Sequence, residues 1–210
     1  MCDNIVFFGV YHWDPLGREK IVMLLNDLRN KGFMPDCIAT EWDKITAQKI
    51  IDQRKWFIKY AKIKAPYLND KTLDALSNAL AYEADSHISL YPDLPMIWLD
   101  EGRKYQGNYA ADRFNFVYMP YIDKLNKVDK NNLQEMSKLI WKEGYTGQPV
   151  DRDRIFYNKI TTTVSDGYKN IFAIVGARHA NTDINGSCID LLMKKGFRVQ
   201  TYILGSPLSI

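Results

Sequence analysis

The chain has 210 residues, of which 46% are hydrophobic, 25% charged and 13% aromatic, and its formal net charge is +3. This composition is typical of a globular protein with a core of normal size and excludes an intrinsically disordered chain. The net charge is too small to indicate a nucleic-acid partner, so we expect none.

The cysteines and the first residues bear on the cellular compartment. Cys2, Cys37 and Cys188 are odd in number and widely spaced, which predicts buried, reduced thiols rather than a disulfide framework. The opening stretch, MCDNIVFFGVYHWD, has no positive charge at its start, and its apolar run is too short for a signal peptide or a membrane span. We therefore expect a cytoplasmic protein without a membrane-spanning segment.

The first part of the chain predicts a strand, a helix and a second strand. Residues 4–10, NIVFFGV, form the short apolar run of a buried strand. Apolar residues then recur at helical spacing over 21–28, and NKG at 30–32 is a helix C-cap signal. PDCIATEWD at 35–43 is a second short strand that ends in acidic residues. This order is the unit from which parallel sheets are built.

The middle of the chain is predicted to be rich in helices. We expect helices over 46–64, about 70–87 and, with interruptions, 108–165, and a short strand, MIWLD, over 96–100. The segment QRKWFIKYAKIK within the first of these helices is dense in lysines. It is explained most simply as a solvated helix face, and otherwise as a lid or a partner-binding surface.

The end of the chain returns to the order of its beginning. NIFAIVG at 170–176 predicts a strand, 185–197 a capped helix and RVQTYIL at 198–204 a final strand. The sequence therefore predicts a single α/β domain over 1–210. Its central, mainly parallel sheet is flanked by helices, and a helix-rich insertion covers about 44–165.

Potentially functional residues follow four of the predicted strands. Ligands of an open parallel sheet gather outside the carboxyl ends of its strands, so these residues could share one site. Those at or directly after the strand ends are Gly9, Tyr11, His12, Trp13 and Asp14 for the first strand, Glu41 and Asp43 for the second, Asp100 and Glu101 for the third, and Gly176, Arg178 and His179 for the fourth.

Two of the three histidines end the same Gly-x-x-His pattern. Gly9 precedes His12 and Gly176 precedes His179, each time by three residues at the end of a predicted strand. A glycine there can take an unusual backbone angle and leaves room for a ligand. The third histidine, His87, falls at a predicted helix end, where a capping or exposed role explains it. The repeat predicts a site shared by the first two.

Imidazole and carboxylate groups together suit a divalent transition metal such as Zn, Mn or Co. Such a metal lowers the pKa of a bound water and polarises a substrate carbonyl. Glu41 is the carboxylate that best fits this set, although an acid after a strand also caps the next helix. Asp43 is the better capping candidate, because it directly precedes KITAQKIIDQ.

The order of these motifs resembles that of a known group of proteins. FFGVYH, PDCIATEWD with Glu41, and IFAIVGARHANTD are similar to strand motifs of the TraB/PrgY and Tiki group, which belongs to a superfamily with erythromycin esterase-like and ChaN-like proteins. ALAYEADSHISLYPDLPMIWLDE, with Glu83, and VDRDRIFYNKI, with Arg152 and Asp153, match two further motifs of that group. The first motif departs by having Tyr11 where the group often has a small residue.

The resemblance implies an α/β fold with pseudo-symmetric halves and a metal centre made of two histidines and a glutamate. Tiki-like members are described as metal-dependent proteases, whereas other members act in pheromone shut-off or bind haem. The resemblance therefore supports the site more closely than it supports a substrate.

Our leading hypothesis is a metal-dependent hydrolase, with a peptidase as one form of it. His12 and His179 would bind a divalent Mn, Co or Zn ion, with Glu41 as the third ligand or general base. Arg152 would stabilise an oxyanion or hold a substrate carboxylate of a peptide or small molecule. Tyr11 and Arg178 are expected to line the substrate pocket. Three acids are second-choice metal ligands or orient the histidines, and two of them also count as substrate-binding candidates: Glu83 and Glu101, with Asp100 as the third acid.

Two alternatives stay open. One is a non-enzymatic protein on the same fold that binds a peptide or haem, with the helical middle as its recognition surface. The other is a metal-free, esterase-like enzyme in which His12 and Glu41 form a general acid–base pair. The sequence leaves the substrate and the oligomeric state open.

Overall fold

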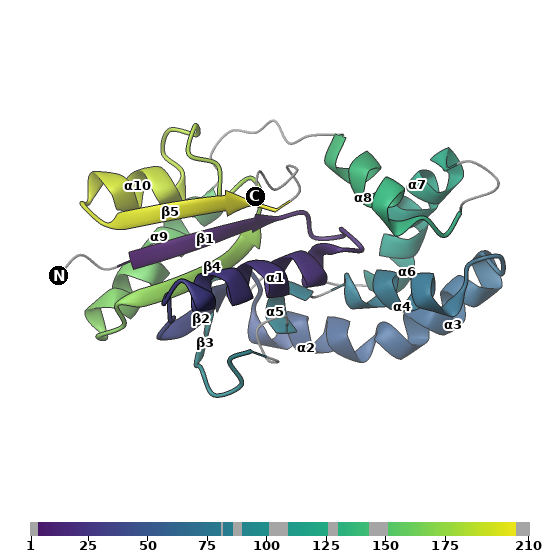
Figure 1. Ribbon diagram of the computed structural model, residues 1–210, viewed down its shortest axis with the longest axis horizontal. Coiled ribbons are helices and arrows are strands. Elements are labelled where there is room, and N and C mark those ends of the chain that lie inside the picture. The colour runs from purple at the N-terminus through teal and green to yellow at the C-terminus, as the bar shows by residue number, and fades with distance from the viewer. Residues whose placement is uncertain are drawn as a thin grey trace.

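An open sheet of five parallel strands forms the centre of the computed structural model (Figure 1). The structure describes residues 4–80, 82–85, 90–100, 109–125, 130–142 and 151–204. The strands are β1 (Asn4–Val10), β2 (Cys37–Thr40), β3 (Met96–Trp98), β4 (Asn170–Gly176) and β5 (Arg198–Ile203), and their order across the sheet is β3-β2-β4-β1-β5. The predicted α/β class is confirmed, and every strand pair is parallel.

The helices fall into two groups by position (Figure 1). Three lie against the sheet: α1 (Gly17–Asn30), α9 (Asp151–Ser165) and α10 (Cys188–Lys194). The others extend beyond its carboxyl edge: α2 (Lys44–Asp52), α3 (Arg54–Lys64), α4 (Asp70–Asn78), α5 (Tyr82–Asp85), α6 (Tyr109–Arg113), a π-helical turn η1 (Phe114–Tyr118), α7 (Met119–Lys124) and α8 (Leu133–Lys142). The helix predicted over 46–64 is divided at Gln53 into α2 and α3.

Alternate side chains of the strands build two separate cores. On β1, Val6 and Phe8 pack with α1 and the helices of the insertion. Ile5 and Phe7 face the other way and pack with α9 and α10. This alternation follows from the two-residue period of a strand, and it gives an α/β/α arrangement of three layers.

The chain order produces a crevice at the carboxyl ends of β1 and β4. These strands are neighbours, with Gly9 opposite Val175 and Val10 opposite Gly176. The chain leaves β1 toward α1 on one face of the sheet and leaves β4 toward α10 on the opposite face. Where adjacent connections diverge in this way, an open sheet leaves room for a ligand.

Two further expectations concern the cysteines and the membrane. Cys37 and Cys188 are buried free thiols, as predicted, and burial raises the pKa of Cys37 to about 12. Cys2 lies outside the described residues. Among the helices that the structure describes, none combines the length and apolar character that crossing a membrane requires.

Candidate active site

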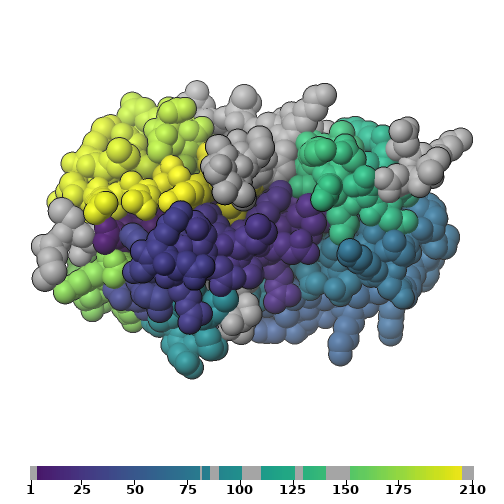
Figure 2. All heavy atoms as spheres, viewed as in Figure 1, coloured from purple at the N-terminus to yellow at the C-terminus, as the bar shows by residue number. Residues whose placement is uncertain are grey.

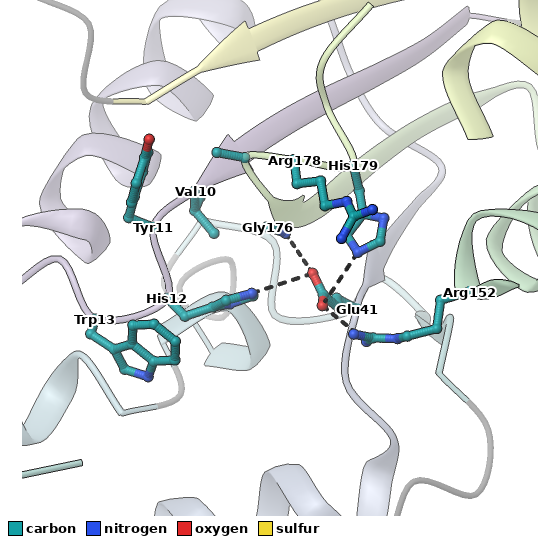
Figure 3. Close-up of a pocket in the computed structure, with 10 residues that line it drawn as sticks. Val10, Tyr11, His12, Trp13, Glu41, Arg152, Gly176, Arg178 and His179 are labelled. Carbon is teal, nitrogen blue, oxygen red and sulfur yellow. Dashed lines mark hydrogen bonds and ion pairs between the residues drawn. The ribbon is translucent and has the colours of Figure 1, made fainter. Parts of the chain in front are cut away.

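A pocket of about 380 Å³ lies at the carboxyl ends of β1, β2 and β4 (Figure 3). Residues from both Gly-x-x-His strand ends line it, together with Glu41, which follows β2, and Arg152 in the first turn of α9. Its lining consists of Val10, Tyr11, His12, Trp13, Glu41, Arg152, Gly176, Ala177, Arg178 and His179. The structure thus brings the two repeated histidines and Glu41 together, as their places in the sequence suggested.

Glu41 is the centre of this pocket. Its side chain is 8% exposed, and its Oε2 accepts a hydrogen bond of 2.5 Å from the backbone N–H of Gly176. The same Oε2 lies 3.5 Å from His12 Nε2, and Oε1 lies 3.8 Å from His179 Nε2. The two imidazoles therefore face one carboxylate, each from its own strand end (Figure 3).

Each imidazole is also held from behind by a second carboxylate. His12 Nδ1 lies 2.7 Å from Oε1 of Glu83, which belongs to α5 and is fully buried. His179 Nδ1 lies 2.9 Å from Oδ1 of Asp153 on α9. A carboxylate on Nδ1 fixes the orientation of the ring and leaves Nε2 to face the site.

Arg152 connects Glu41 to a further acid. Its Nη2 lies 2.9 Å from Oε1 of Glu41 and 2.7 Å from Oδ2 of Asp100, the residue that follows β3 by two positions. The guanidinium also lies over the Phe156 ring, 5.3 Å from its centroid. Arg152 is therefore fixed by charge on one side and by an aromatic ring on the other.

The glycines of the two motifs fit the strand ends against each other. A Cβ on Gly176 would lie 2.7 Å from His12 Nε2 and 3.1 Å from Glu41 Oε2. A Cβ on Gly9 would lie 2.6 Å from the Cβ of Ala180 and 3.0 Å from the Cα of Ala177. Each glycine therefore makes room for residues that follow the other strand, which explains the repeated pattern.

The charges of the site shift two pKa values in opposite directions. Burial alone would lower the pKa of His12, but the negative charges of Glu41 and Glu83 outweigh it and raise the pKa to about 9. Burial alone would raise the pKa of Glu41, but His12, His179, Arg152 and the Gly176 N–H lower it to about 2. At neutral pH the pocket therefore holds an imidazolium beside a carboxylate.

The other predicted site residues are distributed around this centre. Tyr11 and Arg178 line the pocket, as expected for residues next to the histidines. Glu83 lies behind His12 and is not part of the pocket wall, so its position is that of an orienting group, and burial raises its pKa. Asp100 binds Arg152, whereas Glu101 and His87 lie outside the described residues. Asp43 caps α2 by accepting from the N–H groups of Ile45 and Thr46, as predicted.

Two tryptophans lie near His12: Trp13, which the sequence places among the candidates at the end of the first strand, and Trp42, for which the sequence predicts no role. The rings of Trp13 and Trp42 lie 5.7 and 6.2 Å from the His12 ring, and Arg113 of α6 lies 4.5 Å from the Trp13 centroid. Trp42 directly follows Glu41 within the predicted strand over 35–43, and this position was its only signal in the sequence. Of the two, Trp13 lines the pocket and gives it an apolar side next to its charged one.

The donor atoms of the site do not fit a divalent transition metal in this arrangement. Both oxygens of Glu41 are engaged, one by the Gly176 N–H and the other by Arg152, so neither oxygen is open to a metal. Within the described ranges, no group of three or more His, Cys, Asp or Glu side chains could hold a metal ion. The metal stays a prediction from the sequence.

Fold and site together define an α/β protein with an open parallel sheet and a charged pocket at its carboxyl edge. No family model and no curated protein matches the sequence. A solved structure, described as that of the type III effector HopBA1, is similar to 95% of this chain and 75% of its own, at 15% identity and a TM-score of 0.37. At that score the likeness assigns neither a family nor an activity to this chain.

Proposed function

We propose that the protein is a hydrolase that works by general acid–base catalysis with two imidazoles and without a metal. One observation carries the proposal: the Nε2 atoms of His12 and His179 face the two oxygens of one buried carboxylate, while both Nδ1 atoms are bound to carboxylates of their own. Two oriented imidazoles beside a cavity provide one group to donate a proton and one to accept it.

His12 is the general acid of this proposal. Its pKa of about 9 keeps it charged at neutral pH, and its side chain is 24% exposed where it borders the pocket. Nε2–H can therefore donate a proton to the leaving group as the scissile bond breaks. Glu83 on Nδ1 then stabilises the ring in its correct orientation.

His179 is the general base of this proposal. Donation from Nδ1–H to Asp153 leaves the lone pair on Nε2, on the side of Glu41 and the pocket. It takes a proton from the water that attacks the substrate carbonyl. The pKa of Glu41, about 2, favours a role as counter-ion for His12 and Arg152 over that of a base.

The pocket favours substrates whose transition state develops negative charge. Arg152 and Arg178 both line it, and a fixed guanidinium stabilises an oxyanion as the carbonyl is attacked. Tyr11 and Trp13 contribute the apolar part of the wall. We therefore place carboxylic esters and amides first among the substrate classes.

The predicted metal-dependent hydrolase is a second candidate, favoured by one specific feature. Metal-bound histidines usually donate their other ring N–H to a carboxylate, and both His12 and His179 make such a contact. The contact of Arg152 with Glu41 Oε1, at 2.9 Å, favours the first candidate over this one.

The test compares hydrolysis of a panel of chromogenic esters and peptide amides with and without a chelator. We expect activity that resists the chelator and falls about 10²–10⁴-fold in both His12→Ala and His179→Ala. The exposed residue Lys195, at the end of α10, supplies a matched control as Lys195→Ala, which keeps full activity. Loss of activity with the chelator and recovery with Zn²⁺ or Mn²⁺ would support the metal candidate instead. An inactive protein with a haem absorption band would overturn both.

A further inference from the structure

The outward face of α3 carries basic and large apolar side chains, and none of them belongs to the candidate active site. Between Arg54 and Lys64 the helix carries five basic residues and no acidic one. Its inner face is occupied, because Phe57 and Ala61 are fully buried in the core of the insertion. Side chains of the blue segment that includes α3 project from the lower edge of the molecule in Figure 2.

Large apolar side chains form a stripe along this face. Trp56, Tyr60 and Ile63 recur at helical spacing, and Tyr67 continues the series just beyond the helix end. Trp56 is 39% exposed, Ile63 78% and Tyr67 48%, and the Tyr60 ring stacks on Trp56 at a centroid distance of 5.0 Å. Single exposed apolar residues are ordinary, but a contiguous stripe is typical of an interaction surface.

Aromatic exposure continues onto the neighbouring π-helical turn. Asn115 of η1 exchanges hydrogen bonds of 2.8 and 3.1 Å with the Tyr60 hydroxyl, and the next residue, Phe116, is 76% exposed. The insertion thus presents apolar side chains from two adjacent elements.

Lysines flank the apolar stripe. Lys55, Lys59 and Lys62 recur at the same helical spacing, and all three are exposed. Lys62 pairs with Asp70 at 2.8 Å, whereas Lys55 and Lys59 form no ion pair within the described part of the chain. Their charge is therefore available to an anionic partner.

We propose that this α3 surface docks the protein onto an anionic lipid bilayer. A solvated helix face explains the lysines but leaves Trp56, Ile63 and Tyr67 exposed to water at a cost. A helix with aromatic and aliphatic residues on one side and lysines beside them is the pattern of an interfacial helix, whose apolar side chains enter the headgroup region. The exposed apolar residues lie along one helix with lysines beside them, which favours a charged lipid plane as the partner.

The proposal is independent of the proposed hydrolysis, because it uses none of the pocket residues. It predicts binding of the intact protein to vesicles of phosphatidylcholine containing about a third phosphatidylserine, with much weaker binding to phosphatidylcholine alone. Each lysine near an anionic surface contributes about 1 kcal/mol, so Lys55→Gln with Lys59→Gln should weaken binding roughly 30-fold. Lys169→Gln with Lys195→Gln removes the same charge from exposed positions beside the sheet and should leave binding within about twofold.

A second measurement tests insertion. Bromine-labelled lipids should quench tryptophan fluorescence in the wild-type protein, and this quenching should be lost in Trp56→Tyr. Equal binding to neutral and anionic vesicles, equal effects of the two double variants, or no vesicle binding at all would each overturn the proposal. Binding to an acidic protein without binding to vesicles would also overturn the proposal.

Discussion

The two Gly-x-x-His strand ends meet at Glu41 but are held in place by different parts of the molecule. His179 is fixed within the sheet layers, since Asp153 on α9 binds its Nδ1 and also accepts the N–H of Cys188. The Phe156 ring lies 4.9 Å from the imidazole, and the His179 side chain is only 6% exposed. This strand end is part of the core.

His12 depends on the helical insertion instead. Glu83 of α5 binds its Nδ1, and the hydroxyl of the preceding Tyr82 donates a 2.6 Å hydrogen bond to the carbonyl of Tyr11. The side chain is 24% exposed and borders the pocket. The same sequence motif thus places His179 in the core and places His12 where the helical insertion holds it. Because His12 is more exposed and borders the pocket, it is better placed to contact a substrate.

The largest expected effect comes from removing the carboxylate charge that both rings face. Glu41→Gln keeps the shape but leaves His12, His179 and Arg152 without their common anion. We expect a loss of about 3–5 kcal/mol in the free energy of unfolding, measured by urea denaturation at pH 7. Glu83→Gln is the matched control, because Glu83 contacts His12 and not His179, and it should cost less. Equal losses would show that Glu41 is not the common centre.

The pH dependence of stability should separate the two rings. The pKa of His12 is raised from 6.5 to about 9, so its stabilising charge is complete below pH 6.5 and is lost as the pH rises toward 9. This amounts to about 3 kcal/mol across that window. On the acid side, the lowered pKa of Glu41 removes stability as the pH falls from 4.5 toward 2.

Chemical denaturation between pH 6 and 10 measures the alkaline change. His12→Gln should abolish most of it, whereas His179→Gln should leave a decline over the same range. NMR titration of the His12 ring supplies a direct reading. A midpoint for His12 near 6.5 in the wild-type protein would refute the ion pair with Glu41.

The fold could be predicted because its signals are local. Each strand is a short apolar run with a turn signal after it, and helical spacing between the runs indicates crossover helices. The division of the predicted 46–64 helix at Gln53 had no such signal. Gln53 has helical backbone angles, and its side-chain oxygen accepts the N–H of Ala110 from a distant segment. Tertiary contacts of this kind do not show in local spacing.

The site was predictable in its centre and less so in its surroundings. The repeated glycine–histidine spacing, together with the predicted strand ends, indicated that His12, His179 and Glu41 lie at one edge of the sheet. Spacing could not show that Glu83, 71 residues from His12, would lie behind it rather than line the pocket. Nor could it show that Asp100 would engage Arg152, because that pairing depends on how β3 and α9 lie against each other.

The smallest expected effects come from the two glycines, because a Cβ at each would meet a different kind of neighbour. A Cβ on Gly9 would meet Ala180 and the backbone of Ala177, which cannot move away alone, so Gly9→Ala should cost about 1–3 kcal/mol of stability. A Cβ on Gly176 would meet the end of the His12 side chain, which can rotate. Gly176→Ala should therefore cost less stability but displace His12 from Glu41.

Urea denaturation and the NMR-detected pKa of His12, measured on both variants, distinguish these outcomes. Gly9→Ala should lower the unfolding free energy and leave the pKa of His12 near 9 in the folded protein. Gly176→Ala should bring that pKa down toward 6.5, because the imidazolium loses its contact with the carboxylate. The reverse pattern would mean that the first glycine shapes the pocket and the second only packs the strands. That result would contradict the contacts in the structure, where Gly9 packs against the other strand end and Gly176 faces His12.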